Sequence, residues 1–437
     1  MNRRGFPRRF RSPVLPWAAR ATLEFMIEWS ETHLAIRDAF RRFVATEIEP
    51  NLEELEHGDT PPYAVLRKMV ETFGLADMAR MRFASELSKE RAEPGGSGET
   101  AAPRERKPDP EAANVVAMQL IPIIELCHYS PGMVTALGVS MGLTARAILS
   151  RGTRAQKERW ALPLLTLEAI GAWAITEPSS GSDAFGGMKA TARRDGEGGY
   201  LLNGTKTFIT NGPYADTIVF ICKLDDGDDP KERKVLSFIL DKGMPGLTQS
   251  KPLRKMGLHS SPTGELFLED VRVGKDRLIG ETEDVAARSG AKETFTSERT
   301  GVVAMALGMV EQCLKLSVEY AKTRVQFGRP IGEFQLIQLK LAKMEVARMN
   351  IRNMVFRQIE LAASGRSMTL AEASACKLYA AQATMDVCLE AVQLFGGNGY
   401  MAEFQVEQLC RDAKVLQIYG GTDEIQISQI ARSLLGE

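Results

Sequence analysis

The spacing of apolar residues changes twice along this chain of 437 residues, and that change limits the folds open to it. Over roughly 23–83 and 111–149, apolar residues recur three and four positions apart, the period of helices with one buried face. Between about 171 and 280 they form short strand-like runs separated by Gly, Pro and Asp turns. From about 286 onward the helical period returns. The sequence therefore predicts a helical, β, helical layout.

Two features interrupt this layout. Asn203-Gly204 lies between two strand-like runs, and Asn-Gly is the dipeptide most typical of a two-residue hairpin turn. We therefore predict a β-hairpin there. Residues 86–109 contain Ser, Glu, Lys, Arg, Gly and Pro but hardly an apolar side chain. Such a segment buries too little surface to offset its ordering entropy, so we predict a mobile insertion.

The predicted organisation has four parts. A disordered or targeting extension covers 1–22, an N-terminal helical domain 23–170, a middle β domain 171–280, and a C-terminal helical domain 285–437. The extension is rich in arginine and contains no acidic residue over its first 13 positions, which is compatible with a transit peptide. We expect a cytoplasmic protein of a bacterium, or a mitochondrial matrix protein if the extension is a transit peptide.

Composition excludes several classes of function. Charged residues make up 25% and the net charge is −1, which favours neither nucleic acid nor an anionic membrane as a partner. No uninterrupted run of about 20 apolar residues occurs, so we predict no membrane span. The six cysteines and four histidines show no metal-ligand spacing, and no glycine-rich dinucleotide motif occurs. We expect reduced core thiols in a reducing compartment, and no metal.

Gly420-Gly421 lies between apolar positions at helical spacing, although each interior glycine costs a helix about 1 kcal/mol relative to alanine. One explanation is a helix C-cap followed by Thr422 or Asp423 as the next N-cap. The other is that the next helix N-terminus, with its free N–H groups, points into a ligand site. The spacing alone allows both.

The stretch around these glycines, residues 416–426 (LQIYGGTDEIQ), closely resembles the C-terminal signature of the acyl-CoA dehydrogenases. Five further blocks resemble motifs of the same family in the same order: 174–183 (AITEPSSGSD), 203–212 (NGTKTFITNG), 267–273 (FLEDVRV), 324–331 (RVQFGRPI) and 393–400 (QLFGGNGY). The resemblance covers roughly 23–437 apart from the insertion. It implies an α+β fold with an N-terminal helical domain, a middle β-barrel and a C-terminal four-helix bundle.

The resemblance also implies a reaction. Removing two hydrogens from a Cα–Cβ bond requires a base and a hydride acceptor, and no side chain accepts hydride. In the family FAD is that acceptor, at its N5 atom, and a glutamate is the base. The expected product is a trans-2-enoyl-CoA, with electrons passed to an electron-transfer flavoprotein by a homotetramer of fatty acid metabolism.

Family motifs assign cofactor contacts residue by residue. Thr176 would hydrogen-bond the flavin ring, Phe208 would pack on it, and Thr210 would reach N5. Arg324 and Gln326 match residues that contact the FAD pyrophosphate, usually in a neighbouring subunit, and arginine suits phosphate as a rigid bidentate donor. The remaining expected cofactor contacts are Trp173, Ile175, Ser182, Phe334, Gln335, Gln393, Gly396, Gly397, Thr422 and Glu424.

The catalytic base departs from the commonest family pattern. Many members carry a glutamate at the position of Gly420, and glycine cannot be a base. The branches resembling isovaleryl-CoA and long-chain acyl-CoA dehydrogenases place the glutamate on the first helix of the C-terminal bundle, before an arginine. Glu298-Arg299 occupies that place, so we predict Glu298 as the base, with the Gly420 N–H holding the thioester oxygen.

Substrate contacts are expected at Ser182, Thr296, Ser297, Arg299 and Gly421. His259 stands where the family often has an arginine, and we expect a surface imidazole there. Two other functions remain open: a flavin-dependent monooxygenase or oxidase on the same scaffold, and a non-catalytic acyl-CoA-binding protein. Relatives of the first kind commonly lack both glutamates, so Glu298 argues against it, while Gly420 keeps the second open.

Overall fold

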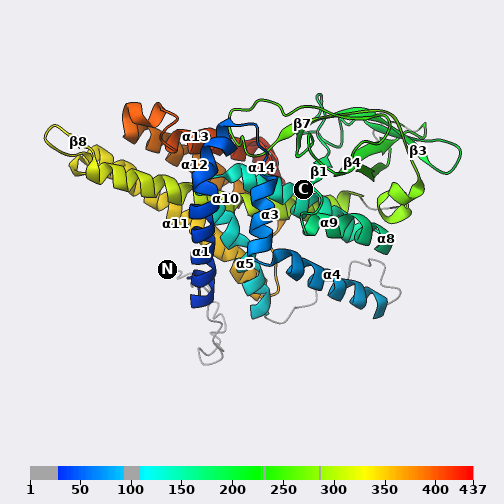
Figure 1. Ribbon diagram of the computed structural model, residues 1–437, viewed down its shortest axis with the longest axis horizontal. Helices are drawn as coiled ribbons and strands as arrows, with labels where there is room; N and C mark the ends of the chain where they lie inside the picture. Colours follow the sequence, from blue (N-terminus) through cyan, green and yellow to red (C-terminus); the bar gives the residue numbers. More distant parts are fainter. Residues whose placement is uncertain (1–27, 93–108, 228, 230–232, 285–286, 437) are drawn as a thin grey trace, which may run out of the picture.

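A computed structural model of the protein describes residues 28–92, 109–227, 229, 233–284 and 287–436 (Figure 1). The predicted extension at 1–22 lies outside the described residues, as does most of the predicted insertion. The elements follow the helical, β, helical order that the apolar spacing predicts.

The N-terminal part is helical up to residue 165. Ser30 caps its first helix by accepting a hydrogen bond from the His33 N–H at 3.3 Å. Its helices are α1 (Glu31–Phe43), α2 (Leu52–His57), α3 (Tyr63–Thr72), α4 (Leu75–Ala92), α5 (Pro110–Leu126), α6 (Pro131–Leu137), α7 (Arg146–Arg151), α8 (Arg154–Gln156) and α9 (Leu162–Leu165), with π-helical turns at Val44–Ile48, Gly138–Ala145 and Lys157–Ala161 and a 3₁₀ turn at Glu49–Asn51.

Helix α4 corrects the prediction of a mobile segment from residue 86. The helix continues to Ala92 and lies against α3 and α9. Leu87, inside the predicted insertion, is buried one turn after the buried Phe83, and the composition of the whole segment concealed this single apolar contact. The rest of the predicted insertion, 93–108, lies outside the described residues.

The middle part is a mixed sheet of seven strands. Its order is β1-β4-β2-β3-β7-β6, with β5 on the other edge of β4. The strands are β1 (Gly171–Ala174), β2 (Thr191–Arg194), β3 (Tyr200–Thr210), β4 (Thr217–Leu224), β5 (Val235–Asp241), β6 (Leu247–Gln249) and β7 (Thr263–Val273). Among the described residues, the three-residue strand β6 pairs with β7 alone, so the expected barrel is not closed.

Strand β4 anchors this sheet because both of its faces are buried. Ile218 and Phe220 face the sheet's own core, whereas Val219 and Ile221 join a second core with Trp160 from the N-terminal helices. The continuous apolar run of β4 is typical of a strand covered on both sides. This arrangement fixes the β domain against the N-terminal helices.

The predicted hairpin at Asn203-Gly204 is wrong. Strand β3 runs without a break through both residues, and the pairing with β7 shifts register there, which is a β-bulge. The Asn203 side chain donates to Asp270 Oδ1 and accepts from the Asp270 N–H, both at 2.9 Å. Gly204 has φ +142, and a Cβ there would lie 2.6 Å from the Ala190 Cβ. Close packing and a bulge, rather than a turn, therefore explain this glycine.

The C-terminal part is the predicted helical bundle. Its helices are α10 (Ala287–Thr323), α11 (Gln335–Ala363), α12 (Leu370–Phe395), α13 (Val406–Ala413) and α14 (Asp423–Leu435), with a small hairpin of β8 (Val325–Gln326) and β9 (Arg329–Pro330) after α10. Helix α10 is central, in contact with α5, α11 and α12. A Cβ at Gly308 would lie 2.2 Å from the Ile124 carbonyl oxygen, so glycine allows α10 and α5 to approach closely.

Two apolar stretches, Pro131–Arg151 and Thr296–Thr323, are long and apolar enough to cross a membrane by length and composition. In the most apolar part of each stretch, 50% of the first and 67% of the second is buried inside the protein, as in the core helices of soluble proteins. The expected lack of a membrane span therefore stays a prediction. All six cysteines are free, and four of them are buried, as predicted for core thiols.

Candidate functional site

Glu298, the predicted base, lies directly beside Gly420, the glycine at the position where many family members carry a glutamate. Glu298 is on α10, and Gly420 lies in the turn before α14. A Cβ built on Gly420 would lie 3.5 Å from Glu298 Cδ and 3.7 Å from its Oε1. Gly420 has φ +62, a conformation that favours glycine. The carboxyl group of Glu298 therefore borders the space that a side chain at position 420 would enter.

The surroundings of Glu298 alter its acidity. Burial raises the pKa of Glu298 to about 7, and the positive charges of Arg299 and Lys377 oppose that rise. The residue keeps some exposure, which a group that must meet a substrate requires. Arg299 is buried and its Nη1 donates to Ser374 Oγ at 2.9 Å. A carboxyl group with this pKa exchanges protons near neutral pH, the range that suits a general base.

The turn after Gly420 begins α14. Thr422 is the N-cap, and its hydroxyl accepts from the Ile425 N–H at 3.4 Å. Gly421 has φ +88, and Glu424 is exposed in the first turn. The N-cap half of the capping explanation is confirmed, with Thr422 rather than Asp423 as the cap. The C-cap half is not, because the preceding 3₁₀ turn ends at Gln417 with Ile418, not glycine, as its C-cap. The ligand explanation stays a prediction.

Thr296 and Ser297 precede Glu298 on α10. Thr296 is half-buried and Ser297 is exposed. Ser297 Oγ accepts from Arg146 Nη1, on α7, at 3.4 Å. The structure thus gathers Thr296, Ser297, Arg299 and Gly421 around Glu298, while their predicted contacts with substrate remain untested.

On the β domain, the segment after β1 lies beside β3. The Thr207 N–H donates to the Thr176 carbonyl at 3.0 Å, which brings Thr176 next to Phe208. Phe208 is 69% exposed and has φ +56, although its neighbour Ile209 is buried. An exposed aromatic residue held in left-handed backbone is unusual, and the predicted role of Phe208 beside a flavin stays a prediction. Of the other predicted cofactor contacts here, Ile175 is buried, Trp173, Thr176 and Thr210 are half-buried, and Ser182 is exposed.

A buried ion pair connects the two segments that carry Thr176 and Phe208. Lys206 Nζ donates to Glu177 Oε1 and to the Ile175 carbonyl, both at 2.9 Å, and the side chains are 0% and 4% exposed. Glu177 also accepts from the Lys189 and Ala190 N–H groups at 2.7 and 2.9 Å. The pair therefore ties the 175–177 segment to β3 on both sides of Thr176.

The remaining predicted cofactor contacts lie elsewhere. Arg324, Gln326, Phe334, Gln335, Gln393, Gly396 and Gly397 surround the β8–β9 hairpin and the end of α12, and all but the half-buried Phe334 are exposed. Tyr320 joins the two segments, donating to the Phe395 carbonyl at 3.4 Å and accepting from Asn398 at 3.0 Å. The hairpin and the β domain lie at opposite ends of the long axis (Figure 1). One chain therefore does not bring the two groups together.

Three family models match the chain in the order of its parts. "Acyl-CoA dehydrogenase, N-terminal domain" matches 30–81, the middle domain 172–271, and the C-terminal domain 289–435. An acyl-CoA dehydrogenase of Bacillus subtilis is 35% identical over 407 residues, 93% of this chain and 99% of that protein. The chain belongs to the acyl-CoA dehydrogenase family. It is therefore an oxidoreductase, and the predicted family and three-part fold are confirmed, with an open sheet in place of the expected closed barrel.

Solved structures of this family resemble the whole chain. Butyryl-CoA dehydrogenase from Megasphaera elsdenii superimposes with a TM-score of 0.79 at 32% identity, covering 93% of this chain and 99% of that one. An acyl-CoA dehydrogenase complexed with FAD from Bacillus anthracis gives a TM-score of 0.78 at 28% identity, covering 94% of this chain and 68% of that one.

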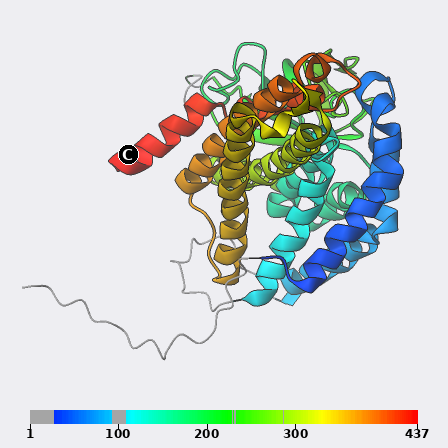
Figure 2. The same ribbon diagram turned by 90° about the vertical axis from the view of Figure 1, so that its left-hand side faces the viewer.

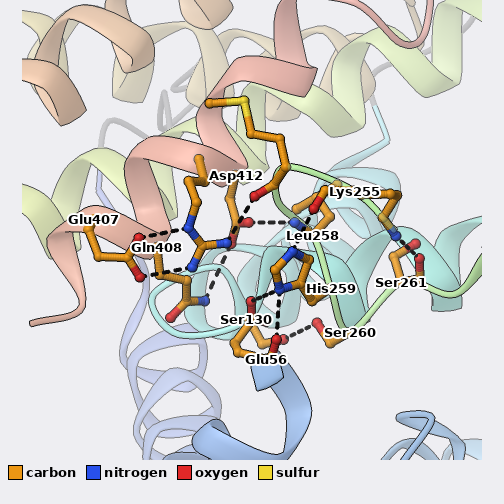
Figure 3. Close-up of polar contacts among 12 residues, drawn as sticks. Glu56, Ser130, Lys255, Leu258, His259, Ser260, Ser261, Glu407, Gln408 and Asp412 are labelled. Atoms are coloured by element: carbon orange, nitrogen blue, oxygen red, sulfur yellow. Dashed lines mark hydrogen bonds and ion pairs between the residues drawn. The ribbon is translucent and has the colours of Figure 1, made fainter. Parts of the chain in front are cut away.

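At the junction of the three parts of the chain, His259 is half-buried and contacts two carbonyl groups, where a surface imidazole was expected (Figure 3). Its Nδ1 lies 2.7 Å from the Glu56 carbonyl of α2, and its Nε2 lies 2.9 Å from the Lys255 carbonyl. A neutral imidazole donates from one nitrogen only, so both contacts are hydrogen bonds when the ring is protonated. Asp412 of α13 contacts the same loop, because its Oδ1 accepts a hydrogen bond from the Leu258 N–H at 2.5 Å.

This junction contains two buried acids. Burial raises the pKa of Glu56 to about 8, with the charge of Asp412 adding to the rise, and burial also raises the pKa of Asp412. The Arg411 charge, the Ser260 hydroxyl and the Lys255 charge oppose the rise for Glu56 but do not cancel it. Lys255 lies in the same loop, and burial lowers its pKa to about 8. Ionisation of Glu56 is therefore unfavourable in the folded protein.

The raised pKa of Glu56 makes stability depend on pH. Below about pH 4.5 the carboxyl group is protonated in both the folded and unfolded states. As pH rises toward 8 the unfolded chain releases this proton and the folded protein retains it, so the free energy of unfolding falls. We expect Glu56→Gln to raise that free energy by roughly 2–4 kcal/mol at pH 8.5 and to have little effect at pH 4.5. Urea unfolding at the two pH values measures this difference.

Glu53→Gln, at an exposed position of α2, is the control and should show no such dependence on pH. An effect of Glu56→Gln that is the same at both pH values would contradict the prediction.

The absence of a side chain at Gly257 allows its loop to pack directly against α13 at this junction. A Cβ there would lie 2.6 Å from Asp412 Oδ1 and 2.7 Å from the Arg411 carbonyl carbon. We expect Gly257→Ala to lower the free energy of unfolding by about 1–3 kcal/mol, since the loop must move off α13. Thermal unfolding measures the change. Gly142→Ala is the matched control, because its Cβ meets nothing within 4 Å, and equal effects of the two substitutions would contradict this interpretation.

Sequence reasoning missed two buried side chains near Gly420. Lys377 and Gln426 are both 0% exposed. Lys377 lies on the same face of α12 as Ala373 and Ala381, which are four residues away on either side and buried. A lysine within an apolar stripe was the signal that could have identified it. Gln426 carried no comparable signal.

Proposed function

We propose that this enzyme is an FAD-dependent acyl-CoA dehydrogenase that converts an acyl-CoA thioester to the trans-2-enoyl-CoA, with Glu298 as the α-proton base. One observation carries the assignment of the base: the Glu298 carboxyl group lies beside Gly420, where many family members carry their glutamate. Its acidity supports the role, because the pKa of about 7 leaves a reactive carboxylate at neutral pH.

The chain's own residues fit FAD. The exposed Phe208 ring provides a flat apolar surface for a flavin, and the half-buried Thr176 and Thr210 nearby would provide hydrogen bonds to it. Thr422 and Glu424 would complete this side at the start of α14. When bound, FAD supplies the two-electron acceptor that side chains cannot provide.

Each residue near the reacting carbons then has a defined task. Glu298 removes the α-proton and holds it on its carboxyl group. The Gly420 N–H makes no hydrogen bond within the described residues, so it is available to the thioester oxygen as negative charge develops there. Ser182, Thr296, Ser297, Arg299 and Gly421 are the proposed contacts to the acyl-CoA.

The second group of cofactor residues requires another copy of the chain. Arg324, Gln326, Phe334, Gln335, Gln393, Gly396 and Gly397 would hold the pyrophosphate and adenosine of the FAD bound to a neighbouring subunit. Several apolar side chains support a homotetramer because they are more than half exposed in the single chain. They are Val325 and Phe327 in the hairpin, Leu336, Leu339, Val346 and Met349 on α11, and Ile427, Leu434 and Leu435 on α14. Helix α14 projects from the rest of the chain (Figure 2), as expected of an element that packs on a partner.

The proposed electron acceptor is an electron-transfer flavoprotein, and the proposed compartment is the bacterial cytoplasm. The six free cysteines support a reducing compartment. A mitochondrial location would depend on the extension at 1–22, which lies outside the described residues.

Anaerobic titration with acyl-CoA thioesters tests the proposal. The purified holoenzyme is mixed with straight-chain, branched and aromatic acyl-CoAs while the absorbance of oxidised flavin is followed. We expect one class to bleach the flavin, and electron-transfer flavoprotein to restore the absorbance faster than oxygen does. Rapid restoration by oxygen alone would identify an oxidase. If dithionite bleaches the flavin and no acyl-CoA does, acyl-CoA dehydrogenation is wrong.

A further inference from the structure

We propose that Lys377 is a positioning residue for the reaction, holding the Gly420–Gly421 backbone in place and providing a positive charge that acts on Glu298. The inference rests on the proposed function and extends it. It starts from a buried cation for which the resemblance to the family predicted no role.

Lys377 lies on α12 with its side chain 0% exposed. Its Nζ donates to the Gly421 carbonyl at 2.8 Å and lies 3.6 Å from Asp423 Oδ1. Lysine is rarely buried completely, because its ammonium loses hydration that only charged or hydrogen-bonding partners replace. The partners here belong to the turn that carries Gly420 and to the first residue of α14. The ammonium therefore links α12 to this turn.

A second buried side chain holds the same turn. Gln426 Nε2 donates to the Gly420 carbonyl at 3.0 Å and to the Gly421 carbonyl at 2.8 Å. Both carbonyls thus point to buried donors on α12 and α14. Because a peptide group is planar and trans, fixing the Gly420 carbonyl fixes the peptide plane between Gly420 and Gly421, and fixing the Gly421 carbonyl fixes the next plane, between Gly421 and Thr422. The turn is held in a conformation with positive φ at both glycines, next to the Glu298 carboxyl group.

The charge of Lys377 acts on Glu298 from a different helix than that of Arg299. Arg299 is the neighbour of Glu298 on α10, and Lys377, on α12, also lowers the pKa of Glu298 through its charge. Asp423 on α14 is the acid paired with Lys377, and Tyr419 in the turn also interacts electrostatically with Glu298. Burial alone favours the protonated form of Glu298, which cannot accept a proton from substrate. The positive charges of Arg299 and Lys377 oppose this effect and increase the fraction of Glu298 that is present as the carboxylate.

Infrared titration of the holoenzyme without substrate tests the charge directly. The carboxylic-acid band of Glu298 is identified as the band that is absent from the spectrum of Glu298→Gln. This band disappears as Glu298 loses its proton, so the pH at which half of its intensity remains is the protonation midpoint of Glu298. We expect Lys377→Met to raise this midpoint by about one pH unit, because a favourable charge is removed. Lys377→Arg should leave it close to that of the wild type. Lys340→Met, which removes an ion pair with Glu390 between α11 and α12, is the control without an expected shift.

Flavin reduction tests the positioning role. With a substrate that bleaches the wild-type flavin, we expect Lys377→Met to shift the pH profile of reduction upward and to lower the limiting rate about tenfold. Asp423→Asn provides a second variant should Lys377→Met not fold, and it should lower the infrared midpoint by leaving Lys377 unopposed. An unchanged midpoint in both substitutions would overturn the proposal. The infrared result is independent of turnover, so failure of the proposed function, seen as no bleaching of the wild type, remains distinguishable.

Discussion

Replacing Glu298 by Gln should abolish most flavin reduction by acyl-CoA while leaving the cofactor bound. The amide keeps the size of the side chain but cannot accept the α-proton, and general bases typically contribute 10²–10⁴-fold to rate. We therefore expect the anaerobic reduction rate to fall by at least about a hundredfold. Stopped-flow absorbance of the flavin measures it, and the FAD content of the purified protein shows whether the cofactor is retained.

The wild-type profile gives an independent check on Glu298. Because the carboxylate is the reactive form, the rate of reduction at low substrate should rise with pH around a midpoint of about 7. Glu319→Gln, at an exposed position of the same helix, is the matched control and should keep the wild-type rate and profile. Near-normal reduction in Glu298→Gln with FAD bound would remove Glu298 from the mechanism.

The position of Glu298 was predictable from the sequence, and its surroundings were not. Gly420 and Glu298 are 122 positions apart, and only the resemblance to the family connected them before the structure brought them together. The burial of the Lys377 ammonium and of the Glu56 carboxyl group depends on which helix face each one occupies after three parts of the chain have packed. Local periodicity gives the face but not the partner, because the partner comes from another element.

Errors in the sequence predictions have a common physical cause. Asn203-Gly204 has ideal hairpin chemistry, but pairing of β3 with β7 and close packing on Ala190 place it inside a strand. His259 looked like a surface residue because its spacing in the sequence indicates no buried contact, whereas in space the Glu56 carbonyl of α2 contacts its ring. Tertiary contacts outweigh local preference at both positions.

The largest loss of stability is expected from breaking the buried Lys206–Glu177 pair. Lys206→Met would leave the Glu177 carboxylate buried with its two backbone donors but without its cation. Removing one partner of a buried ion pair typically costs about 3–5 kcal/mol, because the remaining charge is not compensated. Urea unfolding of the holoenzyme at neutral pH measures the change. We also expect weaker FAD binding, since the pair holds the segments that carry Thr176 and Phe208.

Two further variants separate the buried charge from packing. Lys234→Met breaks an ion pair with Asp284 that is largely exposed, and should change the free energy of unfolding by less than about 1 kcal/mol. The double substitution Lys206→Met with Glu177→Gln removes both charges, so it should recover part of the loss caused by Lys206→Met alone. If the double variant is no more stable than the single one, the loss comes from the other contacts of the Lys206 ammonium, with the Ile175 carbonyl and the Phe220 ring, rather than from an uncompensated carboxylate. In that case the 175–177 segment is held to β3 by the lysine itself rather than by its pairing with Glu177.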